Sequence, residues 1–339
     1  MSSKASAPGV KAQPGRALRV GVIGAGVMGS NHARVLAGLP GVSLVGVVDP
    51  SPAHRIRATE IADCHSFETL DRLVAEGVDA VTIAAPTHLH HEIALACIAS
   101  NVHLLVEKPI ASSVEEGREI VAAARRAGVT LMVGHVERFN PAVPAIKKAI
   151  AGEDILSIAI TRVGPFPPRM SNVGVVIDLA VHDIDLIRWF TESDIVEVQP
   201  QLSSAVAERE DIALLQFRTA SGVLAHINTN WLTPFKARSV TVATRGKYVM
   251  GDLLTRQVTE CFGFKPDGSY SMRHLPVGHD EPLRAELISF LNAVRHGETP
   301  AVTGDEGVAS LEIATRCLEM PSRPAAASPA RKGPRRVAG

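Results

Sequence analysis

The sequence predicts an α/β protein with two unlike domains, and three observations carry that prediction. In the first half, short apolar runs alternate with helical stretches, which is typical of a doubly wound parallel sheet covered by helices on both faces. In the second half, longer strands with period-two stretches and turn signals indicate an α+β domain with an open, mostly antiparallel sheet. The length of 339 residues also exceeds what one hydrophobic core usually serves.

The expected elements follow one another in chain order. Strands of the first half are expected at 18–26, 42–50, 80–86, 103–109 and 130–135, with helices at 31–39, 93–100 and 115–128. The second half is expected to hold strands at 157–164, 213–232, 239–252 and 257–263, and helices at 177–191, 282–294 and 304–318. We therefore expect a first domain at 17–139 and a second at 140–320.

The composition is ordinary for a globular protein, with 46% hydrophobic and 21% charged residues. It excludes a disordered chain, a collagen-like chain and a strongly basic nucleic-acid binder. No apolar run is long enough to span a membrane, and the N-terminus lacks the apolar region of a signal peptide. We therefore expect a cytoplasmic protein without membrane or nucleic-acid partners, whose four scattered cysteines are buried free thiols.

Both tails have compositions typical of disorder. Residues 1–16 and 321–339 are rich in small residues and proline, and together they carry eight basic residues and no acidic one. The basic C-terminal tail could contact nucleic acid or a membrane surface, but a solvated extension is favoured. Without the tails, 27 basic residues stand against 35 acidic ones, so the zero net charge of the chain conceals a body near −8.

A glycine turn follows the first strand and opens a helix. Its residues Gly24, Gly26, Val27, Met28 and Gly29 form a GxGxxG motif in the context that gives it meaning. The first glycine makes the tight turn, the second lets the backbone approach a pyrophosphate, and the third allows the helix to pack on the strand. Free N–H groups at the helix start then favour the phosphates. The motif predicts a Rossmann-type dinucleotide site.

Asp49 ends the second strand, where an acidic residue is expected in such a domain. A carboxylate at this position can bind both ribose hydroxyls of NAD, and it would repel the 2′-phosphate of NADP. Pro50 and Ser51 follow, and no arginine is adjacent to accept that phosphate. The sequence therefore predicts NAD as the cofactor.

Two further strand ends carry polar motifs at the edge of the sheet where ligands bind. The first loop includes His88, His90 and His91, and the second is Glu107-Lys108-Pro109. The histidine spacing fits no common zinc pattern and lacks a second ligand cluster, so no metal is expected. Lys108 could orient a substrate hydroxyl or help to lower its pKa.

The helix at 177–191 is apolar almost all round, yet it carries Asp178, His182 and Asp185 on one face. Ionisable groups in a buried helix are costly unless they are paired or used. We expect Asp178 to hold the His182 imidazole in one tautomer, so that the ring acts as a base near neutral pH. A buried Asp–His pair with only a structural role is the alternative.

These motifs resemble the Gfo/Idh/MocA family of NAD(P)-dependent oxidoreductases. The chain has Pro86-Thr87-x-x-His90, with Thr87 in place of the family's common Asn, and then Glu107-Lys108-Pro109. The resemblance implies cofactor contacts from both motifs, and Lys108, Asp178 and His182 as catalytic residues. It further implies a cis Lys108–Pro109 bond, and a second domain that binds substrate and assembles a homodimer or homotetramer.

The reaction implied by the resemblance is alcohol oxidation. His182 would take the proton of a sugar hydroxyl, with Lys108 bonded to the same oxygen, while the carbinol hydrogen leaves as hydride to the nicotinamide. Four stretches, at 134–141, 162–169, 178–185 and 228–238, are similar to family members that oxidise the 3-hydroxyl of UDP-N-acetylglucosamine. An aminotransferase partner would then install a 3-amino group that ends in lipid A or surface polysaccharide.

Several residues in these stretches are candidates to bind such a substrate. They are Arg138, Arg162, Arg169, Asp185, Trp231, Lys236 and Arg238. Arg162, Arg169, Lys236 and Arg238 suit a diphosphate. Trp231 could stack on a ring or pack in the core.

Two other functions stay open. A family dehydrogenase could act on inositol, a free sugar or a UDP-aminosugar acid, although a free sugar would not need the arginines. A non-catalytic dinucleotide-sensing regulator is expected to lose the lysine or the histidine, and this chain keeps Lys108, Asp178 and His182.

Overall fold

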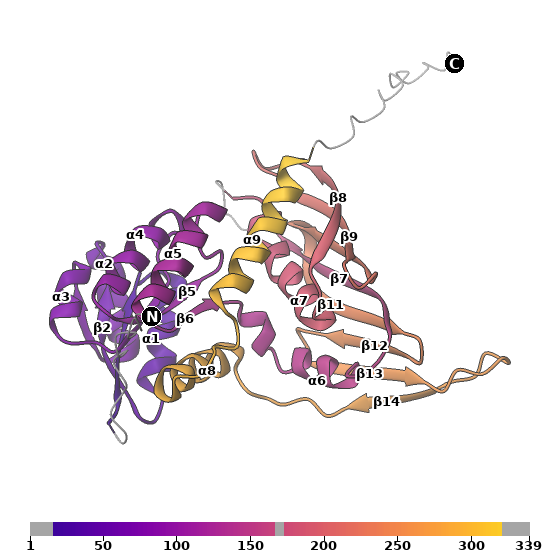
Figure 1. The fold of residues 1–339 in the computed structure, drawn as a ribbon, viewed down its shortest axis with the longest axis horizontal. Coiled ribbons are helices and arrows are strands. Elements are labelled where there is room, and N and C mark those ends of the chain that lie inside the picture. The colour runs from indigo at the N-terminus through magenta and orange to yellow at the C-terminus, as the bar shows by residue number, and fades with distance from the viewer. Residues whose placement is uncertain (1–15, 167–172, 321–339) are drawn as a thin grey trace, which may run out of the picture.

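The computed structural model describes residues 16–166 and 173–320. The described chain forms two sheets, each with its own hydrophobic core, and helices lie between them (Figure 1). This arrangement confirms the predicted fold class. The predicted disorder of the two tails concerns residues that lie outside the described ranges, apart from Arg16. Arg169, predicted to bind substrate, also lies outside them.

The first sheet has six parallel strands in the order β3-β2-β1-β4-β5-β6. The strands are β1 (Leu18–Ile23), β2 (Val42–Val48), β3 (His65–Phe67), β4 (Ala80–Ile83), β5 (His103–Glu107) and β6 (Leu131–Gly134). The strand order reverses between β1 and β4, and in such sheets the crevice at the carboxyl ends of these two strands takes the ligand.

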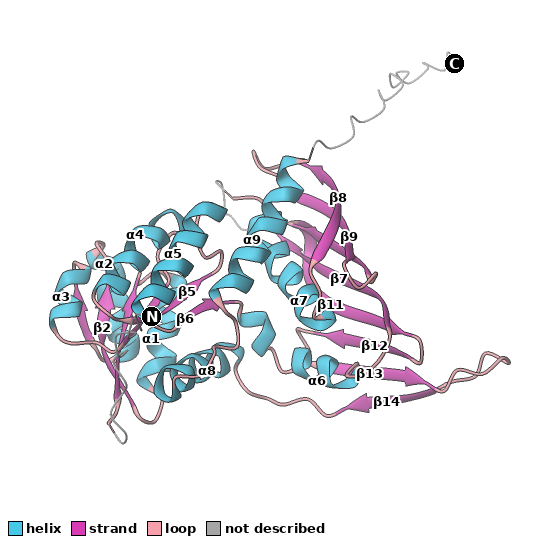
Figure 2. Ribbon diagram, viewed as in Figure 1, coloured by secondary structure: helices cyan, strands magenta, loops and turns pink. Residues whose placement is uncertain are grey.

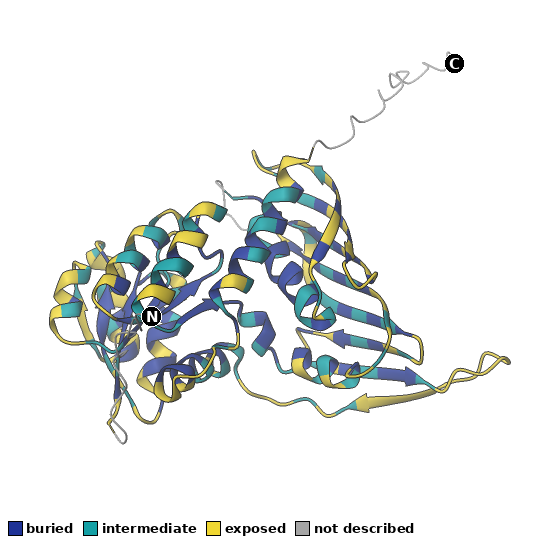
Figure 3. Ribbon diagram, in the orientation of Figure 1, coloured by how far each residue is buried: buried dark blue, intermediate teal, exposed yellow. Residues whose placement is uncertain are grey.

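Helices cover both faces of this sheet, as the apolar strands require (Figure 3). They are α1 (Val27–Ala37), α2 (Pro52–Ala62), α3 (Leu70–Ala75), α4 (His90–Ala99) and α5 (Val114–Ala127), with short turns η1 (Thr87–Leu89) and η2 (Val136–Phe139). Local signals set their ends. In α5, the Ser113 side chain accepts a hydrogen bond from the Glu116 N–H, and Gly128 ends the helix in the left-handed conformation.

The second sheet has eight strands in the order β14-β13-β12-β11-β7-β10-β9-β8. They are β7 (Ile155–Pro165), β8 (Ile195–Ser203), β9 (Ile212–Thr219), β10 (Leu224–Asn230), β11 (Leu232–Thr244), β12 (Lys247–Asp252), β13 (Gln257–Phe262) and β14 (Ser271–Leu275). Strands β7 and β10 pair in parallel, and the other neighbours pair antiparallel.

Helices cover one face of the second sheet (Figure 2). They are α6 (Ala142–Ala149), the π-helical turn η3 (Val176–Ala180), α7 (Val181–Thr191) and α9 (Gly304–Glu319). Side chains in β9 and β10 alternate between buried and solvent-facing positions, so the far face of the sheet is open. The catalytic candidates therefore lie on the covered side, towards the first domain.

Two C-terminal helices tie the domains together. Helix α8 (Pro282–His296) packs Leu287 and Phe290 into the core of the first domain, although its residues fall within the second domain predicted at 140–320. Helix α9 contributes Leu311 to the first core and Ala314 to the second. It starts with a capping box between Thr303 and Glu306.

None of the helices in 16–166 or 173–320 is long and apolar enough to cross a membrane. The cysteines are free thiols as predicted: Cys97, Cys261 and Cys317 are buried, and Cys64 is half-buried.

Candidate active site

The glycine turn has the geometry that its spacing predicts. Gly24 has φ +88°, and a Cβ there would lie 2.6 Å from the Ala85 nitrogen. A Cβ on Gly29 would lie 1.7 Å from the Gly24 carbonyl oxygen, so this glycine allows the helix to approach the strand. A Cβ on Gly26 would meet nothing within 4 Å. The backbone at Gly26 is therefore open to a pyrophosphate, as a dinucleotide site needs.

Asp49 joins this turn to the end of β2. Its carboxylate accepts hydrogen bonds of 2.8 Å from the backbone N–H groups of Ala25 and Ser51. Arg55, which sequence reasoning did not weigh, donates to the carbonyl oxygens of Asp49 and Pro50 and to Glu68. The arginine near the expected ribose is therefore held by other partners.

The two strand-end motifs meet at His90. One ring nitrogen lies 2.9 Å from the Pro109 carbonyl oxygen and the other 2.9 Å from that of Ala85. The buried ring therefore bridges the loop after β4, which contains Pro86 and Thr87, and the loop after β5. Burial lowers the pKa of His90. The Lys108–Pro109 bond is cis, as the resemblance implies. His91 instead contacts Glu119 at the surface.

Glu107 lies under the same loop. Its carboxylate is 2.9 Å from Nε2 of the buried His32 on α1, and it accepts a bond of 3.3 Å from the Lys108 backbone N–H. This carboxylate therefore braces the lysine loop against the helix that follows the glycine turn.

The predicted pairing of Asp178 with His182 is not what the structure shows. Asp178 lies in the π-helical turn η3, whose i→i+5 bonding breaks the regular α-helical spacing assumed for 177–191. Lys108 Nζ donates to the Asp178 carbonyl oxygen at 2.7 Å and to its carboxylate at 3.3 Å. Asp178 therefore positions Lys108 rather than the imidazole.

His182 lies at the start of α7 with 8% of its surface exposed. Its Nδ1 is buried without a hydrogen-bond partner, and its ring packs edge-on against His135. Burial holds the pKa of His182 well below its ordinary value, and the nearby Lys108, Arg162 and Arg238 lower it further. The imidazole is therefore neutral at neutral pH and able to accept a proton.

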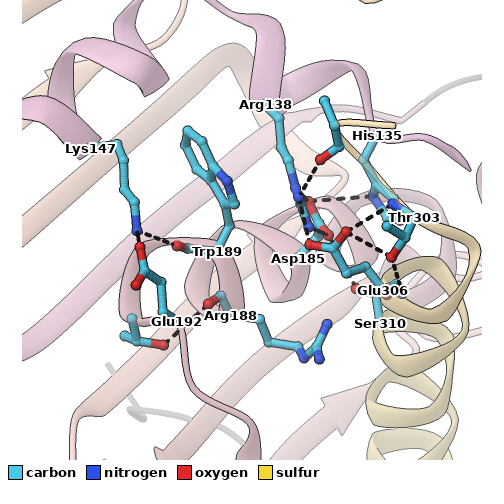
Figure 4. Close-up of polar contacts among 12 residues, drawn as sticks. His135, Arg138, Lys147, Asp185, Arg188, Trp189, Glu192, Thr303, Glu306 and Ser310 are labelled. Carbon is cyan, nitrogen blue, oxygen red and sulfur yellow. Dashed lines mark hydrogen bonds and ion pairs between the residues drawn. The ribbon is translucent and has the colours of Figure 1, made fainter. Parts of the chain in front are cut away.

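Three residues expected to bind substrate are buried in ion pairs instead. Arg162 donates to Asp183 at 2.7 Å and to Glu137 at 2.8 Å. Arg138 donates to both oxygens of Asp185 at 2.6 Å, as Figure 4 shows. All of these side chains are at least nine-tenths buried, so the expectation that Arg138, Arg162 and Asp185 contact a ligand is corrected.

The remaining substrate candidates divide into core and surface. Trp231 is buried and packs edge-on against Phe166 with ring centroids 5.7 Å apart, so it is a core aromatic. Arg238 donates to Glu137 at 2.8 Å, and 34% of its side chain is exposed. Lys236 is exposed, two residues before it on β11. These two cations remain available to an anionic ligand.

His135 is the main functional candidate that sequence reasoning missed. It follows β6, so it lies at the same edge of the sheet as the β4 and β5 loops, and that placement was the signal available in the sequence. The carboxylates that neutralise the arginines, Glu137, Asp183 and Glu306, were missed as well. Nothing local marks them as partners.

The glycine turn is open to a dinucleotide, and a lysine and a neutral histidine lie at the ligand edge of the sheet. These features define an NAD-binding oxidoreductase. Residues 18–135 match the model of an oxidoreductase family with an NAD-binding Rossmann fold, and residues 157–249 match the GFO/IDH/MocA C-terminal domain. The chain belongs to the Gfo/Idh/MocA family.

Characterised relatives span nearly the whole chain. UDP-N-acetylglucosamine 3-dehydrogenase of Acidithiobacillus ferrooxidans is 30% identical over 82% of this chain and 88% of its own length. A solved structure of that enzyme superposes with a TM-score of 0.83 at 28% identity, covering 88% of this chain and 96% of the other. Inositol 2-dehydrogenase of Rubrobacter xylanophilus is 32% identical over 89% of this chain and 90% of its own length.

Proposed function

We propose that this chain oxidises the 3-hydroxyl of UDP-N-acetylglucosamine to the 3-keto sugar nucleotide, with NAD as the acceptor. The observation that carries the chemistry is that Lys108, at the ligand edge of the first sheet, contacts Asp178 in the turn just before the buried His182, so that the lysine lies near the imidazole. The similarity to the Acidithiobacillus ferrooxidans enzyme in sequence and structure supports the choice of substrate.

In this proposal, His182 accepts the proton of the 3-hydroxyl. Lys108 donates a hydrogen bond to the same oxygen and stabilises the negative charge that develops there. Bound NAD supplies the hydride acceptor, so the carbinol C–H bond breaks as the C=O bond forms. Asp178 holds Lys108 in place by accepting hydrogen bonds from its Nζ at the backbone carbonyl and the carboxylate.

The nucleotide diphosphate would be bound by Lys236 and Arg238. Arg238 donates one hydrogen bond to Glu137, which fixes the guanidinium. About a third of its side chain is still exposed. In an acidic body, a sugar nucleotide needs such local cations. Inositol and free sugars carry no phosphate, so substitution of these two residues separates the candidate substrates.

The product would feed a 3-keto-sugar aminotransferase, and the protein would act as a homodimer or homotetramer. The open face of the second sheet supports self-association, because it exposes Leu214, Leu224, Tyr248 and Met272. Two small side chains, Ser157 on β7 and Ala243 on β11, lie between Leu224 and Tyr248 in the strand register. Such a partly apolar face suits a second copy of the same sheet.

The second candidate substrate is inositol. Its support is the 32% identity to inositol 2-dehydrogenase over most of both chains. A non-catalytic regulator is disfavoured, because Lys108 and His182 are both kept and brought together.

An assay of purified protein with NAD and separate candidate substrates tests the proposal. Absorbance of NADH is followed with UDP-N-acetylglucosamine, other UDP-sugars and myo-inositol. Product mass and a coupled aminotransferase guard against an unfavourable equilibrium. Turnover of UDP-N-acetylglucosamine is expected. Turnover of myo-inositol alone would replace the proposed substrate, and no turnover of any alcohol would favour the regulator.

Variants of the two catalytic residues test their roles. His182→Asn and Lys108→Met should each lower kcat by about 10²–10⁴-fold, the usual contribution of a positioned proton-transfer group. Binding of NADH, measured by its fluorescence, should change little. Full activity in either variant would refute that residue's role, and Lys148→Met on the surface of α6 serves as the matched control.

A further inference from the structure

We propose that His135 is a positioning residue of the active site, whose ring fixes the orientation of the His182 imidazole. A catalytic imidazole must present one nitrogen to the substrate, so another group has to hold its plane. Asp178 does not do so, because its oxygens face Lys108. The proposal deepens the proposed dehydrogenase function and rests on it for its kinetic test.

The first support is the contact between the two rings. Their centroids lie 5.9 Å apart and their planes cross at 87°, which is the edge-to-face arrangement that aromatic rings prefer. His182 Nδ1 is buried without a hydrogen-bond partner, so no hydrogen bond at that atom fixes the ring. The ring of His135 therefore limits how far the His182 imidazole can turn.

The second support is that hydrogen bonds hold the backbone of His135 and that its ring lies close to a carboxylate. Its backbone N–H donates to the Val133 carbonyl, and its own carbonyl accepts from the Arg138 N–H. Its buried Nδ1 has no hydrogen-bond partner among the described residues, but it lies 4.0 Å from an Asp185 carboxylate oxygen. Figure 4 draws this contact. The ring thus lies close to both Asp185 and His182.

The third support is the anchoring of Asp185, three residues after His182 on α7. Both of its oxygens accept from Arg138 at 2.6 Å, and the Ser310 hydroxyl lies 3.4 Å away. Arg138 also donates to Glu306 at 2.8 Å and to the Ala301 carbonyl at 3.0 Å. The carboxylate close to the His135 ring is therefore held in place by Arg138, which also contacts helix α9 (Figure 4).

His135 also forms part of the wall that keeps water from His182. Burial is the main reason for the low pKa of His182. The charged groups that also lower it are Lys108 after β5, Arg162 on β7 and Arg238 on β11, and the titratable ring of His135 after β6 faces it as well. Removing the His135 ring would admit water, and the pKa of His182 would then rise towards its ordinary value.

The test compares His135→Ala, which removes the ring, with His135→Phe, which keeps it. Two quantities are measured on the full chain with NAD. One is the pH dependence of kcat/KM with a substrate that the wild type oxidises. The other is the titration of the His182 imidazole by NMR without substrate, assigned with His182→Asn. His296→Ala, at the exposed end of α8, is the control.

H135A is expected to lower kcat at least about tenfold, with little change in KM for NAD, because only the base is misplaced. Its acid limb and the His182 titration should both move to higher pH. H135F should rescue most of kcat and keep the titration near that of the wild type. If H135A does not fold, His135→Leu takes its place, since it fills the space without a ring plane.

Two results would overturn the proposal. One is an unchanged His182 titration and pH profile in H135A. The other is an equal loss of stability and activity in H135A and H135F without any shift of that titration, which is what a purely structural role predicts. If the wild type oxidises no alcohol, the proposed function fails, and the NMR titration still decides the role of His135.

Discussion

The glycine turn shows how three residues of one type meet three different demands. Gly24 needs a left-handed backbone, Gly29 needs the absence of a side chain next to a carbonyl, and Gly26 faces open space. The first two demands arise within the protein, whereas the third arises only when a pyrophosphate approaches. Stability and cofactor affinity are therefore expected to respond to different glycines.

Gly26→Ala and Gly29→Ala separate these demands. G29A places a Cβ against the Gly24 carbonyl oxygen, so it should lower the free energy of unfolding by about 1–3 kcal/mol or more. G26A should leave that free energy within about 0.5 kcal/mol and weaken NADH binding instead. Urea unfolding and NADH fluorescence measure the two quantities. Equal stability of both variants would contradict the steric assignment.

At the scale of elements, α8 and α7 each bury ionisable side chains, but in different states. Helix α8 packs an apolar stripe of Leu283, Leu287 and Phe290 on the first core, with Glu286 fully buried among them. Both carboxylate oxygens of Glu286 lack a hydrogen-bond partner, and burial, with Glu107 nearby, raises its pKa well above the ordinary value. Helix α7 instead pairs its buried Asp183 and Asp185 with arginines.

The buried Glu286 predicts a pH-dependent stability. The folded chain keeps the carboxyl protonated, so the unfolded chain releases its proton as pH rises above about 4.5 and stability is lost. Glu286→Gln removes that proton release. Its unfolding free energy should exceed that of the wild type by an amount that grows by about 1.4 kcal/mol per pH unit, until folded Glu286 begins to ionise.

Urea unfolding between about pH 5 and pH 8 measures this difference. Glu298→Gln, at an exposed site after α8, should show a difference that does not vary with pH. A constant difference for E286Q as well would mean that Glu286 is ionised in the folded chain.

The Arg138 ion pair joins three elements, η2, α7 and α9. Arg138→Met leaves the buried Asp185 carboxylate unpaired, so it should cost about 3–5 kcal/mol of unfolding free energy. Arg125→Met breaks the exposed pair with Asp305, which also reaches α9, and should cost less than about 1 kcal/mol. Denaturant unfolding compares them, and similar costs for the two variants would show that Arg138 does not anchor α7.

At the scale of the whole molecule, charge and shape are divided between the two sheets. The acidic body binds an anionic cofactor through a helix start and its open glycine turn, because its net charge near −8 opposes anions. The second sheet turns its covered face to the site and leaves its other face open. The second sheet can thus complete the active site with one face and associate with another copy of the chain through the other.

Leu224→Asp tests association through the open face. The side chain is 49% exposed on β10, so the substitution should leave the fold and NADH binding intact while it places a charge in the expected interface. Sedimentation velocity should show the wild type as a dimer or tetramer and L224D as a smaller species. Leu318→Asp on α9, away from that face, is the control, and identical sedimentation of L224D and the wild type would place the interface elsewhere.

The sequence by itself determined the fold class, the glycine turn and the strand-end motifs. Each of these follows from local periodicity, or from spacing within one loop, and the parallel sheet then brings the strand ends to one edge. Lys108 and His182 could be identified from the sequence for the same reason, since each lies in a recognisable local pattern.

Only the tertiary structure decided which charged residues face a ligand. Arg138 and Arg162 resemble phosphate binders in sequence, but Glu306 lies 168 residues from Arg138, and Glu137 lies 25 residues from Arg162. Likewise, Asp178 lies in a π-helical turn and contacts Lys108 rather than His182. The ring of His182 packs against His135 instead. A buried charge takes its partner from whatever the fold brings within reach, because leaving it unpaired costs more than any local preference.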